Sequence, residues 1–252
     1  MPKRIIFISD LHLSAANPNM AALFMDFLKG PVKGAQALYI LGDLFDVWVG
    51  QDIHTAFQLS IQQALSAVVK NGTAVYFMNG NRDFLMQNAY LTAVGIKRLT
   101  DPTIIDLYGT PTLLMHGDSL CTEDKAYQRF RRVAQNPITR FLFMCLPKKM
   151  RDNISKKLRA KSQQYQKTQS LTILDVTEVA VHKVMRQHQV SQLIHGHVHR
   201  PNIHEVNSGA KGSKRLVLGD WHDKASLIIS TPEGNSLATY DVKDGVKIIK
   251  ED

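Results

Sequence analysis

The chain has few cysteines and no long apolar run. Its only two cysteines, Cys121 and Cys145, are too few for a disulfide framework and lack the spacing of a zinc site. The richest apolar stretch, 141–146, ends at a proline and two lysines, far short of the roughly 20 residues that span a bilayer. The start, Met-Pro-Lys-Arg, has no apolar stretch followed by a small-residue cleavage site, so we expect no secretory signal and a cytoplasmic location.

Acidic residues are scarce in one part of the chain. Between Cys121 and Ser170 there are 13 Lys or Arg and only 3 Asp or Glu, whereas the whole chain has a formal charge of +9. The rest of the chain therefore carries a net charge of −1. Such a localised basic excess indicates an anionic partner for this segment: lipid headgroups, nucleic acid or a phosphorylated substrate.

Five β-rich runs alternate with helical patterns. The runs cover 4–9, 37–41, 73–78, 112–115 and 192–194, and helical spacing covers 20–28, 54–69 and 171–188. This alternation is typical of βαβ units, in which helices cover a parallel sheet. Beyond residue 199 the pattern changes to short strands without helices, at 203–206, 216–218, 227–230, 237–242 and 246–249. These predict antiparallel strands in a second sheet.

The segment 124–169 differs from both patterns. It is helical and basic, is interrupted by Pro137 and Pro147, and carries interleaved apolar residues such as Phe141. We expect a helical lid here, inserted into a core made of 1–123 and 170–252. A basic surface with interleaved apolar side chains could meet anionic lipid headgroups.

Polar signatures follow the β-rich runs at five places. They are Asp10-x-His12, Gly42-Asp43, Gly80-Asn81-Arg82-Asp83, His116-Gly117-Asp118 and Gly196-His197-x-His199. If the strands are parallel, these side chains converge at one edge. Each signature alone is weak, since Gly-Asp is commonly a turn, but together they predict a two-metal hydrolytic centre bridged by Asp43. Carboxylate, amide and imidazole ligands suit Mn, Fe, Co or Zn, and hydrolysis of a phosphate ester or anhydride is the expected use.

These blocks resemble the D-x-H, G-D-x-x-D, G-N-H-[DE], H and G-H-x-H blocks of the calcineurin-like metallophosphoesterases. The resemblance implies an α/β fold, a four-layer α/β/β/α sandwich carrying the lid. It also implies two metal sites that share Asp43, with Asp46 and Asp83 orienting the ligands. One metal would be held by Asp10, His12, Asp43 and His199, and the other by Asp43, Asn81, His116 and His197.

Arg82 stands where that family pattern has a histidine. Arginine does not donate a proton near neutral pH, but its planar guanidinium can hold phosphate oxygens bidentately. A phosphate leaving group needs charge stabilisation more than it needs a proton, so Arg82 favours a pyrophosphate over a simple phosphodiester. We therefore expect Asp43, Asn81, Arg82 and His116 to be catalytic.

Longer blocks at 80–84, 116–122, 194–201 and 218–221 resemble the branch of the family that hydrolyses UDP-2,3-diacylglucosamine in lipid A biosynthesis. The resemblance implies two Mn²⁺ ions and attack of water on the α-phosphorus, giving UMP and 2,3-diacylglucosamine 1-phosphate (lipid X). It implies an enzyme bound peripherally to the cytoplasmic face of a Gram-negative inner membrane, and we expect a monomer with no nucleic-acid partner. The substrate contacts implied are Asn81, Arg82, Asp124, Ser162, Gln166, Gln169 and His197.

Two alternatives remain. One is a different metallophosphoesterase, such as a nuclease or cyclic-nucleotide phosphodiesterase, whose basic lid grips nucleic acid. Arg82 and the apolar lid residues count against it. The other is a non-catalytic scaffold on a decayed phosphoesterase fold; decay should delete ligands, yet all seven candidates are present.

Overall fold

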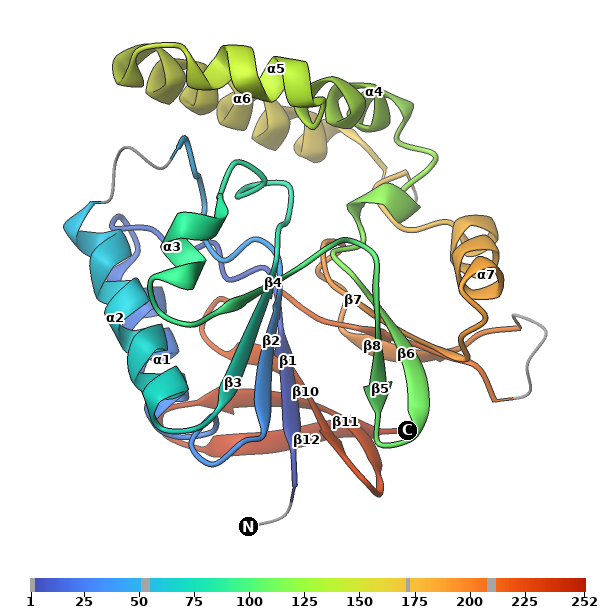
Figure 1. Cartoon of the computed structure of the whole chain (residues 1–252). Coiled ribbons are helices and arrows are strands. Elements are labelled where there is room, and N and C mark those ends of the chain that lie inside the picture. The colour runs from blue at the N-terminus through green and yellow to red at the C-terminus, as the bar shows by residue number, and fades with distance from the viewer. Residues whose placement is uncertain (1–2, 51–54, 171–172, 208–211) are drawn as a thin grey trace.

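Two β-sheets pack face to face, with helices on their outer faces (Figure 1). The computed structural model describes the chain apart from residues 1–2, 51–54, 171–172 and 208–211 and the side chains of residues 163, 166 and 167. A buried apolar cluster that includes Phe7 and Leu41 of one sheet and Leu114 and Ile194 of the other fills the space between the sheets. This burial holds the two inner layers together.

The first sheet has seven strands in the order β12-β11-β10-β1-β2-β3-β4. Four of them run parallel: β1 (Ile5–Ile8), β2 (Ala37–Leu41), β3 (Ala74–Met78) and β4 (Lys97–Leu99). The other three form an antiparallel extension: β10 (Ala225–Thr231), β11 (Gly234–Asp241) and β12 (Gly245–Glu251). β10 pairs antiparallel with β1, aligning Ile229 with Ile6.

The second sheet has five strands in the order β5-β6-β7-β9-β8. Its parallel centre is β6 (Thr110–Met115), β7 (Gln192–His195) and β9 (Lys214–Val217), and its antiparallel edges are β5 (Thr103–Leu107) and β8 (Asn202–Glu205). The sequence interpretation assigned the last three strands to this second sheet, which is wrong, because they extend the first sheet from β1. Apolar periodicity identifies a strand but says nothing about which strand pairs with it.

Helices close the outer faces. α1 (Pro18–Lys29) and α2 (Ala56–Lys70) cover the first sheet, and α7 (Glu178–Gln187) covers the second (Figure 1). The side chains of Asn17, Thr55 and Thr177 cap their N-termini. The predicted helix over 171–188 begins only at Glu178; residues 171–172, like His54 of the second predicted helix, lie outside the described residues. A short helix, α3 (Asn88–Thr92), and a 3₁₀ turn, η1 (Asp118–Leu120), complete the core.

Three helices lie above the strand ends as a lid (Figure 1). They are α4 (Lys125–Ala134), α5 (Pro137–Met144) and α6 (Lys148–Thr168). No side chain of α4 or α5 is buried, so the lid has no core of its own in these helices. Within the described ranges, no helix combines the length and the apolar character needed to cross a bilayer.

Candidate metal centre

Most of the predicted ligands lie at strained backbone positions where the strands end. Left-handed φ angles are uncommon for residues other than glycine and cost of order 1–3 kcal/mol each. Five of the seven candidates adopt them: Asp10 (56°), His12 (49°), Asp43 (54°), His197 (70°) and His199 (55°). Such strain concentrated at one rim is typical of a functional site.

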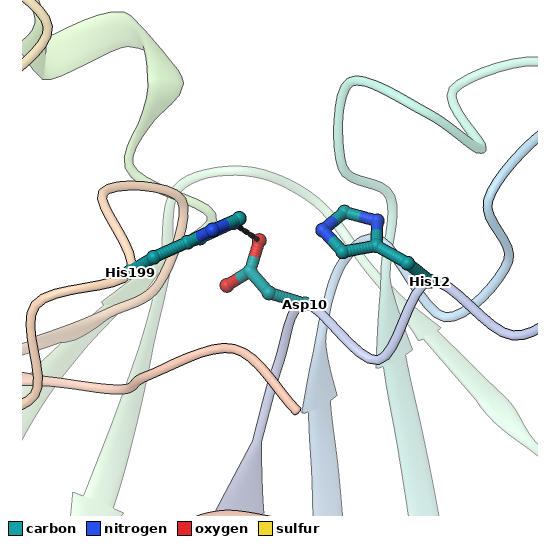
Figure 2. A group of neighbouring side chains, drawn as sticks. All are labelled: Asp10, His12 and His199. Atoms are coloured by element: carbon teal, nitrogen blue, oxygen red, sulfur yellow. Dashed lines mark ion pairs between the residues drawn. The ribbon is translucent and has the colours of Figure 1, made fainter. Parts of the chain in front are cut away.

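The first group of converging side chains is Asp10, His12 and His199, shown in Figure 2. One ligand atom of each lies within 4.8 Å of those of the other two, and His199 Nε2 is 3.4 Å from Asp10 Oδ1. The other carboxylate oxygen of Asp10 accepts hydrogen bonds from the Ser9 hydroxyl (2.6 Å) and the His197 backbone N–H (2.9 Å). These bonds fix the carboxylate with Oδ1 facing the imidazoles.

A second group forms around His116. Its Nδ1 donates to the Leu41 carbonyl oxygen (2.9 Å), which leaves Nε2 as the nitrogen that faces the centre. Nε2 lies 3.0 Å from Asn81 Oδ1, and His197 Nδ1 lies 2.9 Å from the same oxygen. Asn81, His116 and His197 therefore meet at one point, although they come from three separate loops.

Asp43 lies between the two groups. Its Oδ2 is 3.9 Å from His12 Nδ1 in the first group, and its Oδ1 is 3.8 Å from His116 Nε2 in the second. Asp10 is also close to both, because it forms a second compact set with Asp43 and His116. The geometry thus places two buried carboxylates between the imidazoles, and the bridging role of Asp43 stays a prediction.

The residues of this centre fit a pair of divalent ions. Asp10 Oδ1 and His12 Nδ1 are buried and have no hydrogen-bond partner within the part of the chain that the structure describes. Burial raises the pKa of Asp43 to about 7 and lowers the pKa of His12 to about 3, which keeps this imidazole neutral and its lone pair available. Burial disfavours the charged forms of His116 and His199, but the neighbouring carboxylates outweigh it and raise their pKa values to about 9 and about 10. Divalent cations would take the place of these protons beside the carboxylates.

Glycines let the loops approach closely enough to form this centre. A Cβ at Gly42 would lie 2.6 Å from His116 Nδ1, and a Cβ at Gly80 would overlap the Asp43 carboxylate. A Cβ at Gly196 would overlap Asp10 in the same way. The glycine that precedes a ligand in three of the signatures is therefore required by close packing between loops.

Asp83 and Asp46, predicted to orient the ligands, act differently from each other. Asp83 is buried and accepts hydrogen bonds from the Leu44 and Gly80 backbone N–H groups, both at 2.8 Å, which ties together the loops after β2 and β3. Asp46 instead forms an ion pair with Arg159 of α6. One carboxylate supports the centre and the other connects the core to the lid.

A second connection to the lid lies beside His116. Buried Asp118 accepts hydrogen bonds from the Tyr127 hydroxyl (2.8 Å) and from Arg131 Nε (2.7 Å), both on α4. The Tyr127 ring lies 5.7 Å from the His197 ring, measured between centroids. The lid thus contacts a residue of the metal centre. The sequence interpretation assigned no role to Asp118 or Arg131, although Asp118 falls within the His116-Gly117-Asp118 signature.

The predicted substrate contacts of the lid lie on two helices. Asp124 Oδ1 accepts hydrogen bonds from the Tyr127 backbone N–H and the Tyr165 hydroxyl, both at 2.9 Å, so it caps α4 and joins α4 to α6. Ser162 is half-buried on α6, and Gln169 is the C-cap residue of that helix. The side chain of Gln166 lies outside the described residues.

Arg82 and Asp220 complete the surroundings of the centre. The Arg82 backbone N–H donates to Asp43 Oδ1 (2.8 Å), which places this half-buried arginine directly beside the carboxylate between the two groups. Asp220 Oδ2 lies 3.1 Å from His199 Nδ1. Asp220 received no role from the sequence, yet Gly219-Asp220 closely follows β9 and repeats the Gly-Asp pattern of residues 42–43.

Comparison with known proteins gives the family. Residues 3–201 match the calcineurin-like phosphoesterase family. The chain belongs to the calcineurin-like phosphoesterase family. This phosphoesterase is 44% identical to a Pseudomonas fluorescens protein named UDP-2,3-diacylglucosamine hydrolase, over 94% of this chain and 95% of that one. It is 48% identical to a Pseudomonas aeruginosa protein of the same name, over 94% of this chain and 98% of that one.

The fold of the phosphoesterase also occurs in solved structures. A dimetal phosphatase from Danio rerio aligns over 100% of this chain and 98% of its own, with a TM-score of 0.52 and 13% identity, which shows the fold alone. The predicted family, fold class and hydrolase activity are confirmed. Membership of this family also implies a dinuclear site for divalent metals, for which the chain has candidate ligands.

Proposed function

We propose that this phosphoesterase hydrolyses the pyrophosphate bond of UDP-2,3-diacylglucosamine. Water attacks the α-phosphorus, the bond from this phosphorus to the bridging oxygen breaks, and the products are UMP and 2,3-diacylglucosamine 1-phosphate. The names of relatives that are 44% and 48% identical over nearly their whole length support this substrate. Lipid A biosynthesis is the pathway that this reaction serves.

The convergence of seven side chains in two groups around Asp43 and Asp10 carries the proposal. Two divalent ions bound there, for which we propose Mn²⁺, would lower the pKa of a water molecule and neutralise charge on the phosphoryl oxygens. One ion would be held by Asp10, His12, Asp43 and His199, and the other by Asp43, Asn81, His116 and His197. The hydrogen bonds to Asp10 and from His116 to Leu41 preset the ligand atoms before any ion binds.

Arg82 supports a pyrophosphate substrate in particular. Its backbone N–H donates a hydrogen bond to the Asp43 carboxylate, so the Arg82 side chain extends from a backbone position beside the centre of the site. Charge stabilisation by a fixed guanidinium suits a phosphate leaving group, which departs without needing a proton. Asn81 and His197 lie at the same rim and would contact the phosphates, whereas Asp124, Ser162, Gln166 and Gln169 are proposed to face the glucosamine.

The lid would bind the lipid part of the substrate and the membrane surface. Its helices expose large apolar side chains next to many basic residues: Phe130, Val133, Ile138, Phe141, Leu142, Met150 and Leu158. Apolar side chains could meet acyl chains while lysines and arginines meet anionic headgroups. We therefore propose a monomer bound peripherally to the cytoplasmic face of the inner membrane, with no nucleic-acid partner.

Product analysis in ¹⁸O-labelled water tests this function. The Mn²⁺-loaded protein is incubated with UDP-2,3-diacylglucosamine in detergent micelles in the labelled water. The masses of both products are then measured by mass spectrometry. We expect one ¹⁸O atom in UMP and none in the acylated sugar phosphate. Label in the sugar phosphate would refute attack at the α-phosphorus. Cleavage of a simple phosphodiester or of single-stranded DNA, with the UDP substrate left intact, would refute the substrate itself.

A further inference from the structure

A cleft of about 520 Å³ opens next to the metal centre. It is lined on the core side by Gly80, which immediately precedes Asn81, and by Asp118, two residues after His116. On the lid side it is lined by Arg131 of α4 and Arg140 of α5. The cleft is therefore lined by sequence neighbours of two candidate ligands, and its volume falls in the range of small-ligand sites.

Positive charge in this cleft exceeds what its own carboxylates neutralise. Arg131 is paired with Asp118. Among the described residues, Arg98 donates only to uncharged oxygens, including the Met86 carbonyl (2.9 Å) and Asn88 Oδ1 (3.1 Å). Arg140 is half-buried and forms no side-chain hydrogen bond or ion pair within the described ranges. Two guanidinium groups thus share one cleft without a carboxylate partner.

The remaining groups of the cleft agree with an anionic occupant. Burial lowers the pKa of Arg98, and the positive charge of Arg140 lowers it further, so the two guanidinium groups repel each other. Asp101 also lines the cleft, and its Oδ2 already accepts the His116 backbone N–H at 3.2 Å, so the lining has three arginines against two carboxylates. A bound phosphate would relieve the repulsion between these two guanidinium groups and accept hydrogen bonds from their N–H groups.

We infer that this cleft receives the uridine monophosphate half of the substrate, an inference that rests on the proposed function. Arg140 and Arg98 would hold the phosphate and ribose end near Gly80, and the half-buried ring of Phe84 would lie against the pyrimidine. The amide of Gln135, also in the lining, offers both a donor and an acceptor for the uracil edge. The lipid half would then extend in another direction, toward α6.

Arg140→Ala tests this inference, with Arg129→Ala as its matched control. Arg129 is exposed on α4, carries the same charge and does not line the cleft. The affinities of the Mn²⁺-loaded proteins for UMP and for inorganic phosphate are measured by calorimetry, together with KM and kcat for UDP-2,3-diacylglucosamine. Arg140→Lys is included, because it keeps the charge and guards against loss of folding in the alanine variant.

We expect Arg140→Ala to weaken UMP binding about tenfold or more, as for the loss of one charge-assisted contact. KM should rise by a similar factor with little change in kcat, and the affinity for inorganic phosphate should also fall, because Arg140 contacts the phosphate. Arg129→Ala should bind UMP and phosphate as the wild type does. Equal UMP affinity in Arg140→Ala and wild type, or equal losses in both alanine variants, would overturn the inference. A wild type that binds UMP through Arg140 but leaves the UDP substrate intact would overturn the proposed function and keep the cleft as a nucleotide site.

Discussion

His199 lies between two carboxylates: its Nε2 is 3.4 Å from Asp10 Oδ1, and its Nδ1 is 3.1 Å from Asp220 Oδ2. The hydrogen bond to Asp220 fixes the orientation of the ring and directs Nε2 toward the first ligand group. His222 pairs with the same oxygen of Asp220 at 2.7 Å. In metal sites, a carboxylate that binds the nitrogen of a histidine ligand facing away from the metal orients that ligand, and Asp220 is placed to do this for His199.

Replacing Asp220 with Asn should therefore weaken metal binding without removing a ligand. We expect Mn²⁺ affinity at one of the two sites to fall about 10–100-fold, as is usual when such a supporting carboxylate is lost. Equilibrium dialysis with metal analysis measures the affinity and the stoichiometry. Asp223→Asn, the same change at an exposed neighbouring position, should bind two ions as the wild type does. Unchanged affinity in Asp220→Asn would refute the positioning role.

Gly80→Ala should disrupt the centre from the backbone side. The added Cβ would overlap the Asp43 carboxylate and lie 2.6 Å from the Asp43 backbone nitrogen, so the loops after β2 and β3 must move apart. Overpacking of this kind costs about 1–3 kcal/mol. Urea unfolding and metal content are the measurements. Gly30→Ala is the control, because its Cβ meets nothing closer than 3.4 Å; similar stability losses in both variants would contradict this prediction.

Metal removal should destabilise the wild type far more than an Asp43→Asn variant. Without cations the Asp10 and Asp43 carboxylates remain buried in one set with His116, whereas an ion at 100 times its Kd adds about 2.7 kcal/mol of stability. Asn at position 43 removes one of these charges together with a metal ligand. Thermal melts with chelator and with Mn²⁺ measure the difference. An Mn²⁺-induced gain as large in Asp43→Asn as in the wild type would exclude Asp43 as a ligand.

The exposed apolar side chains of the lid should hold the protein on an anionic bilayer. Ile138 on α5 is 69% exposed and Val179 on α7 is 79% exposed. Ile138→Ser removes an exposed apolar side chain from the lid, and Val179→Ser, the control, removes a similar one from the core. Co-sedimentation with vesicles containing anionic lipid should fall for Ile138→Ser and stay unchanged for Val179→Ser. Added salt should weaken the binding of all three proteins, since the lid is basic. Equal losses in both variants would contradict a lid-specific surface.

The sequence predicted the candidate ligands at strand ends, where their local chemistry is distinctive, and their role as metal ligands stays a prediction. The Gly-Asp and Gly-His-x-His patterns mark loops that must approach closely, and the structure brings these loops together with Asp10 and Asp43 buried between them. The pairing partners of the strands were harder to predict from the sequence. β10 pairs antiparallel with β1, with Ile229 opposite Ile6, and no local sequence pattern identifies that partner.

The connections between lid and core were also hidden from the sequence. Arg131 lies 13 positions after Asp118, with Tyr127 between them and no motif spacing, and the three side chains meet only because η1 and α4 pack together. Asp46 and Arg159 are separated by much of the chain. Long-range ion pairs of this kind follow from tertiary packing, whereas the ligand signatures follow from local strand ends.

UMP release from UDP-2,3-diacylglucosamine in micelles with Mn²⁺ is the most direct test of the two-metal pyrophosphatase assignment. Wild type, Asp43→Ala and Arg82→Ala are compared, with Asp223→Ala as a surface control. We predict turnover by wild type and control, its loss in Asp43→Ala, and a decrease of about 10²–10³ in kcat for Arg82→Ala, as when a group that stabilises developing charge is removed. A wild type that binds two Mn²⁺ ions yet releases no UMP would contradict the assignment.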